Sequence, residues 1–179
     1  MKLYCPQCRE EREMILVAKK ETYPVKGEDI TIDATVCTCS KCSEEIFSME
    51  HDEENLKRAY LQYRIRHNLL TPEKIKEIRE QYRISQVTFA RILGVGDKTI
   101  ARYEGGSLQD EAINNLIMLA QNPENFLKLL DKNQEKISPD DVRNIRKDLG
   151  EVKVFVMWSA SENQNKYDAI ESADLDYAC

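Results

Sequence analysis

Two stretches near the beginning of the chain, residues 14–23 and 29–37, have strand-like patterns: the first opens with the apolar run 14–18, and the second alternates polar and apolar residues. A period of two is typical of a β-strand that buries one face. Between the two stretches, residues 25–28 include Gly27, and glycine allows the left-handed backbone that a tight turn requires. The pattern therefore predicts a β-hairpin.

From residue 50 onward the apolar positions recur every three or four residues, which is the spacing of an amphipathic helix. A first helix is predicted over residues 50–70, with a stripe formed by Leu56, Tyr60, Tyr63 and His67. Five shorter helices are predicted over residues 71–131, because residues that begin or end helices recur there at short intervals. These residues are Thr71, Pro72, Ser85, Gly94, Asp97, Gly105, Gly106, Asn122 and Pro123.

The rest of the chain, residues 132–179, carries weaker patterns. Ser138 is typical of a helix start and Gly150 of a helix end, and residues 152–158 alternate in the manner of a strand. From Ser159 onward the chain is polar and acidic, and we expect little order there.

Four cysteines within residues 1–49 form two C-x-x-C pairs, Cys5 with Cys8 and Cys39 with Cys42. A two-residue spacer lets both thiolates of a pair bind one ion, and the predicted hairpin brings the second pair back to the first. Four thiolates in a tetrahedron form a closed zinc site, without a position for a reacting water. We therefore expect a structural zinc ion that stabilises a region with few core residues of its own.

Two alternatives remain open for these cysteines. Cys37 lies two residues before Cys39 and can replace it as a ligand, although Cys39 with Cys42 repeats the spacing of the first pair. If Cys37 is not a ligand, we expect a small buried or spectator thiol. A redox pair has the same C-x-x-C spacing, but such pairs usually belong to a strand–helix unit that this region lacks.

The chain carries 26 basic and 32 acidic residues, and its net charge of -6 disfavours indiscriminate binding to nucleic acid. Residues 83–103 differ from this average, because only Asp97 is acidic there and four residues are basic, namely Arg83, Arg91, Lys98 and Arg102. No apolar run is long enough to cross a bilayer, and no signal-peptide pattern begins the chain. We expect a cytoplasmic protein without membrane contact, in which the thiols stay reduced.

Residues 85–106 read SQVTFARILGVGDKTIARYEGG. Ala90 is small where two helices must cross closely, and Gly94 permits the turn between them. Val95 and Ile100 can fill the space beneath this turn. The order predicts a helix-turn-helix, with an ordinary helical bundle that has a charged face as the alternative. The motif resembles the Xre/lambda-repressor helix-turn-helix family across residues 72–131.

A helix-turn-helix of this kind inserts its second helix into the major groove of DNA. This helix is expected to begin near Asp97, and Arg102 on it can form two hydrogen bonds to a guanine. The preceding helix begins near Gln86, where its free N–H groups can bind a phosphate. Alternatively, Arg91 is an ordinary surface residue whose charge is solvated and does not contact DNA. The candidate DNA-binding residues are Ser85, Gln86, Arg91, Lys98, Thr99 and Arg102.

The order of zinc hairpin, linker helix and helix-turn-helix resembles the MqsA-type antitoxins of bacterial toxin–antitoxin systems. The motifs that carry this resemblance are CPQC at 5–8, CSKCSEEI at 39–46 and RYEG at 102–105. The resemblance implies that the paired cysteines bind zinc and that the zinc domain neutralises a cognate toxin. It also implies a homodimer that represses its own operon at a palindrome in double-stranded DNA. Lys98 stands where the family usually has asparagine, which implies a different operator sequence.

The sequence therefore predicts an α+β protein with four parts. These are a small zinc-bound β-hairpin domain at 1–49, a linker helix at 50–70, an all-α five-helix helix-turn-helix domain at 71–131, and an extension of helix and strand at 132–179. The extension has no counterpart in short members of the family. It can serve dimerisation or toxin binding, or be a solvated addition.

The alternative function is a stand-alone zinc-containing transcriptional regulator without a toxin partner. The residues above are shared by both functions, so the neighbouring gene is what discriminates between them. An enzyme is disfavoured, because the sequence offers no nucleophile–base pair, no phosphate loop and no open metal site.

Overall fold

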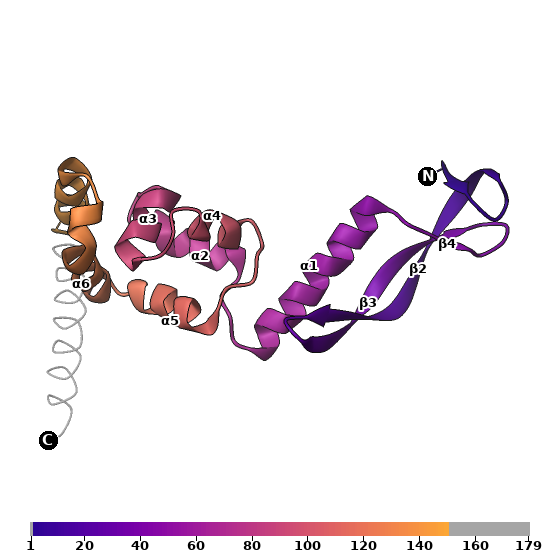
Figure 1. Cartoon of the computed structure of the whole chain (residues 1–179), viewed down its shortest axis with the longest axis horizontal. Coiled ribbons are helices and arrows are strands. Elements are labelled where there is room, and N and C mark those ends of the chain that lie inside the picture. Colours follow the sequence, from indigo (N-terminus) through magenta and orange to yellow (C-terminus); the bar gives the residue numbers. More distant parts are fainter. Residues whose placement is uncertain (1, 151–179) are drawn as a thin grey trace, which may run out of the picture. The chain divides into compact units, whose positions relative to one another are not determined.

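A computed structural model describes residues 2–150, which form two compact units (Figure 1). Among these residues, unit 1 comprises 2–72 with Gly105–Asn114, and unit 2 comprises Glu73–Glu104 with 115–150. The fold is mixed α+β, as the sequence predicts: an antiparallel sheet that carries a cysteine cluster precedes a series of helices. Among the described residues, no helix has the length and apolar character needed to cross a membrane.

Four antiparallel strands form the sheet of unit 1, in the order β1-β2-β3-β4. They are β1 (Lys2–Cys5), β2 (Glu10–Val25), β3 (Glu28–Cys39) and β4 (Glu45–Ile46). The long hairpin of β2 and β3 confirms the predicted hairpin, and both strands extend beyond the predicted stretches.

A two-residue turn joins β2 to β3, because Val25 pairs directly with Glu28. Lys26 and Gly27 in this turn have φ angles of 48° and 85°. Positive φ at both central residues is the signature of a type I′ turn, whose twist matches that of the flanking strands. The turn thus fixes the register along the whole hairpin.

Helix α1 (Met49–Arg66) covers part of this hairpin. The core between them consists of buried residues from both elements, which are Val25, Ile30, Ile32, Ala34, Ala59 and Tyr63. The predicted stripe on this helix is partly wrong, because Leu56 is 40% exposed whereas Asn55 is buried. Asn55 makes two hydrogen bonds of 2.9 Å with the backbone N–H and carbonyl of Thr35. The buried Asn55 side chain therefore supplies hydrogen-bond partners to backbone groups at this edge of β3.

Five α-helices follow in the described chain before residue 134, in agreement with the predicted number. They are α2 (Pro72–Glu80), α3 (Gln86–Leu93), α4 (Thr99–Glu104), α5 (Glu111–Ala120) and α6 (Pro123–Asn133). Phe126 of α6 is fully buried, and its ring stacks on Tyr82 at a centroid distance of 3.7 Å. The Tyr82 hydroxyl donates a hydrogen bond of 2.6 Å to the carbonyl of Ala120.

A short 3-10 turn, η1 (Gln134–Lys136), leads from α6 to a further helix, of which residues 139–150 are described. Its predicted start is confirmed, because the Ser138 hydroxyl accepts a hydrogen bond of 3.1 Å from the N–H of Asp141. The strand predicted over residues 152–158 lies outside the described residues.

Candidate metal centre and nucleic-acid interface

The sheet of unit 1 brings the two cysteine pairs together. Cys5 ends β1 and Cys39 ends β3, and both strands pair with the first part of β2. Cys8 and Cys42 lie in the turns that follow these two strands. Because β1 and β3 both end beside the first part of β2, the four thiols lie close together.

Both C-x-x-C turns have the same backbone geometry. Arg9 and Ser43, which follow the second cysteine of each pair, have φ angles of 58° and 60°. Their N–H groups donate to the carbonyls of Cys5 and Cys39, at 2.8 and 2.9 Å. The repeated turn shows that Cys39 with Cys42 is the structural equivalent of the first pair.

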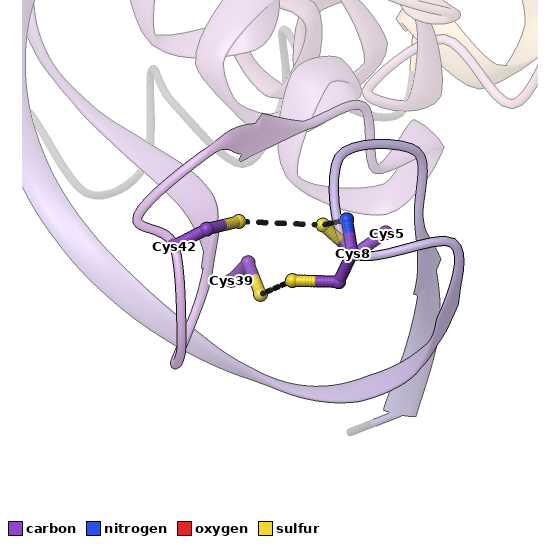
Figure 2. A group of neighbouring side chains, drawn as sticks. All are labelled: Cys5, Cys8, Cys39 and Cys42. Atoms are coloured by element: carbon purple, nitrogen blue, oxygen red, sulfur yellow. Dashed lines mark hydrogen bonds between the residues drawn. The ribbon is translucent and has the colours of Figure 1, made fainter.

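The four sulfur atoms of these pairs all lie within 4.8 Å of one another (Figure 2). Cys5 Sγ is 3.5 Å from Cys42 Sγ, and Cys8 Sγ is 3.9 Å from Cys39 Sγ. A tetrahedral zinc–thiolate site has bonds of about 2.3 Å and therefore sulfur–sulfur edges of about 3.8 Å. A disulfide would bring two sulfurs to about 2.05 Å. The spacing fits a single metal ion bound by four cysteines.

Ionisation of the four thiols also requires a bound cation. Hydrogen bonds from the backbone of Cys42 and Lys41 lower the pKa of the Cys39 thiol to about 6. Burial, followed by hydrogen bonds with the Cys42 and Cys5 thiols, raises the pKa of Cys8 to about 12. Four thiolates at this distance repel one another, so their joint ionisation needs a bound positive charge.

Cys37 does not belong to the cluster. Its side chain is buried on β3, where it pairs in register with Leu16 and Ile46, and burial raises the pKa of its thiol. This is the small buried thiol that the sequence leaves open as one alternative.

The predicted cap and turn of the helix-turn-helix are confirmed in unit 2. The Ser85 hydroxyl accepts a hydrogen bond of 3.0 Å from the N–H of Thr88, which caps α3. Gly94 ends α3 with a φ of 72°, and the next N–H, that of Val95, reaches back to the carbonyl of Ala90 at 3.0 Å. This left-handed cap directs the chain into the turn before α4.

Helix α4 begins at Thr99, two residues later than the sequence suggests. Asp97, the expected cap, instead accepts two hydrogen bonds from Arg91, at 3.1 Å from Nε and 2.8 Å from Nη2. This bidentate, charge-assisted pair uses both carboxylate oxygens with which Asp97 was expected to cap the helix. Arg91 thus spans the turn, and both partners are exposed.

The other candidate residues, on α4 and just before it, differ in exposure. Lys98 and Arg102 are exposed and lie one helical turn apart, since the N–H of Arg102 donates to the carbonyl of Lys98 at 3.1 Å. Thr99 lies between them in sequence but is only 8% exposed. Of the three residues, the exposed ones are therefore the two cations, Lys98 in the turn just before α4 and Arg102 on α4 itself.

An ion pair that sequence reasoning missed connects three helices of unit 2. Glu104, at the end of α4, accepts hydrogen bonds of 2.7 and 2.9 Å from Arg79 of α2. Its second oxygen also accepts a bond of 2.7 Å from Gln86 Nε2, at the start of α3. The side-chain amide of Gln86 is thus used inside the protein, whereas its backbone stands at the beginning of α3.

Glu104 is ionised in this environment. Burial alone would raise the pKa of its carboxyl, but the hydrogen bonds from Arg79 and Gln86 outweigh this effect and the pKa is lowered. No local sequence pattern predicts the Arg79–Glu104 pair, because its members are 25 residues apart in the chain.

A family model described as the antitoxin component of the bacterial toxin-antitoxin system, MqsA, matches residues 1–132. The matched span contains both cysteine pairs and the helix-turn-helix. No curated protein sequence matches the chain significantly. The helix at 139–150 lies beyond the matched span.

Proposed function

Because the chain belongs to the MqsA antitoxin family, we propose that it neutralises a cognate toxin through unit 1 and represses its own operon through unit 2. The observation that supports the second half is the exposed cationic pair Lys98 and Arg102, at the start of α4 and on it, after the left-handed cap at Gly94. Neither role requires a catalytic group, and the protein acts by binding.

The cysteine cluster is proposed to hold a structural zinc ion. Cys5, Cys8, Cys39 and Cys42 fill all four positions of a tetrahedron, so the ion would stabilise unit 1 rather than activate water. Thiolates also suit other soft metal ions, but a closed four-cysteine site is typical of zinc. Reduced thiols of this kind fit a protein of the cytoplasm.

The DNA contacts are proposed to come from the exposed face of α4 and the beginning of α3. Arg102 has the planar group that can bind both acceptors of a guanine, and Lys98 can reach a neighbouring base or phosphate. Ser85 and Gln86 begin α3, whose N–H groups can bind a backbone phosphate. Thr99 is too buried to be assigned a base contact. Arg91 adds charge nearby, although two of its donors already bind Asp97.

A palindromic operator requires two copies of unit 2. We propose that α5 supplies their contact, because Met118 and Leu119 are large apolar residues that are 47% and 56% exposed. The two copies of α4 would then meet half-sites about one helical turn, ~34 Å, apart.

The toxin is proposed to dock on the free edge of β2. β1 pairs with this strand only as far as Glu13, and no other described strand pairs with the edge opposite β3. Ile15, Leu16 and Val17 on this strand are 52%, 52% and 42% exposed. A free edge with apolar side chains is the surface to which another protein can add a strand.

Co-expression with the small reading frame beside this gene tests the toxin role. If the frame encodes the toxin, its product arrests growth alone, and this chain restores growth. Leu16→Lys should abolish the rescue, whereas Ile65→Lys, at another exposed apolar position of unit 1, should retain it. A neighbouring product that is harmless, or that does not co-purify with this chain, would contradict the toxin role and favour a stand-alone regulator.

A further inference from the structure

The helix at 139–150 is an integral part of unit 2, although it lies beyond the span that matches the family. Ile145 and Leu149 on this helix are 3% and 5% exposed, and Ile137 before it is 7% exposed. Arg146 also forms an ion pair with Asp131 of α6. The helix is therefore packed onto the DNA-binding unit and held there by both apolar and charged contacts.

One side of this helix faces the beginning of α3. Asp141, Asn144 and Asp148 follow one another at helical spacing and line a cleft of about 280 Å³. The opposite wall of the cleft consists of residues from the end of the α2–α3 connection and from α3, namely Tyr82, Arg83, Ile84, Ser85 and Thr88. Two carboxylates thus share a cleft with the exposed cation Arg83.

The basic residues of the same helix lie elsewhere. Arg143 pairs with Asp140 and Arg146 pairs with Asp131, and neither these arginines nor Lys147, the third basic residue of the helix, lines the cleft. The acidic side of the helix therefore faces the beginning of α3, where the proposed function places a DNA phosphate. Negative charge at this place repels a phosphate and weakens the attraction of Arg83 for it.

We propose that the acidic side of the helix at 139–150 lowers the affinity of unit 2 for DNA, as an autoinhibitory contact built into the fold. This inference rests on the proposed DNA binding by α3 and α4. It gives the extension a role that needs neither a toxin nor a second copy. A single charge beside a helix terminus changes binding by roughly two- to five-fold, so removal of both carboxylates should tighten binding by roughly four- to twenty-five-fold.

The test compares the full chain with the double variant Asp141→Asn, Asp148→Asn. A control double variant, Asp140→Asn with Glu124→Gln, removes the same number of charges from exposed positions that do not line the cleft. The probe is a fluorescently labelled duplex of the region upstream of this gene, and its affinity is measured by anisotropy at low and at high salt. Thermal unfolding of each variant verifies that the fold is retained.

The expected result is tighter binding by the cleft variant alone, with a difference that shrinks at high salt because ions screen the carboxylates. Equal affinities for the wild type and the cleft variant would overturn the inference and leave the proposed DNA binding intact. Equal gains for both double variants would also overturn it, since net charge would then be the cause. Failure of every variant to bind the duplex would contradict the proposed DNA binding itself.

Discussion

The carboxylate of Glu104 is held by Arg79, whose Nε and Nη2 donate to its two oxygens at 2.7 and 2.9 Å. The two side chains are only 6% and 11% exposed. Because Gln86 binds the same carboxylate, this pair fixes the end of α4 against both α2 and α3. The orientation of the proposed recognition helix thus depends on a charge that is largely removed from water.

Removal of this carboxylate should strongly destabilise unit 2. Glu104→Ala removes the closest charge partner of the largely buried Arg79 guanidinium, which then keeps only Glu80 at 3.4 Å and the Ile84 carbonyl at 2.9 Å. Loss of one member of a buried ion pair typically costs about 3–5 kcal/mol in the free energy of unfolding. Denaturation in urea measures this loss. Glu77→Ala is the control, because the Glu77 side chain is 68% exposed in its pair with Lys74 and its loss should cost at most about 1 kcal/mol. Similar losses for both variants would show that the buried Glu104–Arg79 pair stabilises unit 2 no more than an exposed surface pair does.

The same pair predicts a dependence of stability on pH. The pKa of Glu104 lies below its ordinary value of 4.5 in the folded protein, so its ionised form stabilises the fold above that pH. This contribution is lost as the pH falls through the lowered pKa of the folded state. The difference in unfolding free energy between wild type and Glu104→Gln should therefore be constant near neutral pH and shrink on acidification. A difference that grows in acid would refute the assignment.

Metal content distinguishes the ligands from the thiol beside them. Cys39→Ser should abolish zinc binding after dialysis, because a hydroxyl is a poor ligand in a thiolate site. Cys37→Ser should retain one zinc ion per chain, since this thiol lies outside the cluster. Elemental analysis of both purified variants makes the comparison. Retention of zinc by Cys39→Ser together with its loss from Cys37→Ser would reverse the ligand assignment.

Two glycines in unit 2 should respond to alanine in opposite directions. Gly94→Ala forces a left-handed residue with a Cβ, at a φ of 72°, and should cost about 1–2 kcal/mol. Gly150→Ala replaces an exposed helical glycine around which a Cβ meets nothing within 4 Å, and should stabilise by about 0.4–1 kcal/mol. Thermal unfolding measures both changes. Stabilisation by Gly94→Ala would mean that the turn does not need its left-handed cap.

The features that sequence reasoning predicted well are those fixed by neighbouring residues. The turn at Gly27, the cap at Ser85 and the end of α3 at Gly94 each depend on a few adjacent positions, and the structure confirms all three. The two cysteine pairs can also be predicted from their C-x-x-C spacing, because one local turn brings the two thiols of each pair together.

The features that were missed depend on partners far away in the chain. Asn55 is buried because it satisfies the backbone of Thr35, and helical periodicity alone favours an apolar residue there. Helix α4 begins two residues after Asp97, and the carboxylate of this expected cap binds Arg91, six residues earlier in the chain. The burial of Thr99 follows from how α4 packs on its neighbours, which its own type does not reveal.

Arg102 on α4 is proposed to contact DNA, and fluorescence anisotropy with a duplex from the region upstream of this gene tests this contact most directly. Wild type should bind this duplex in preference to a scrambled one, and Arg102→Ala should lose about 1–3 kcal/mol of that binding without loss of the fold. Lys57→Ala, which removes an exposed cation from α1, should bind like wild type. Unchanged affinity of Arg102→Ala, or a wild type that does not distinguish the two duplexes, would contradict the claim.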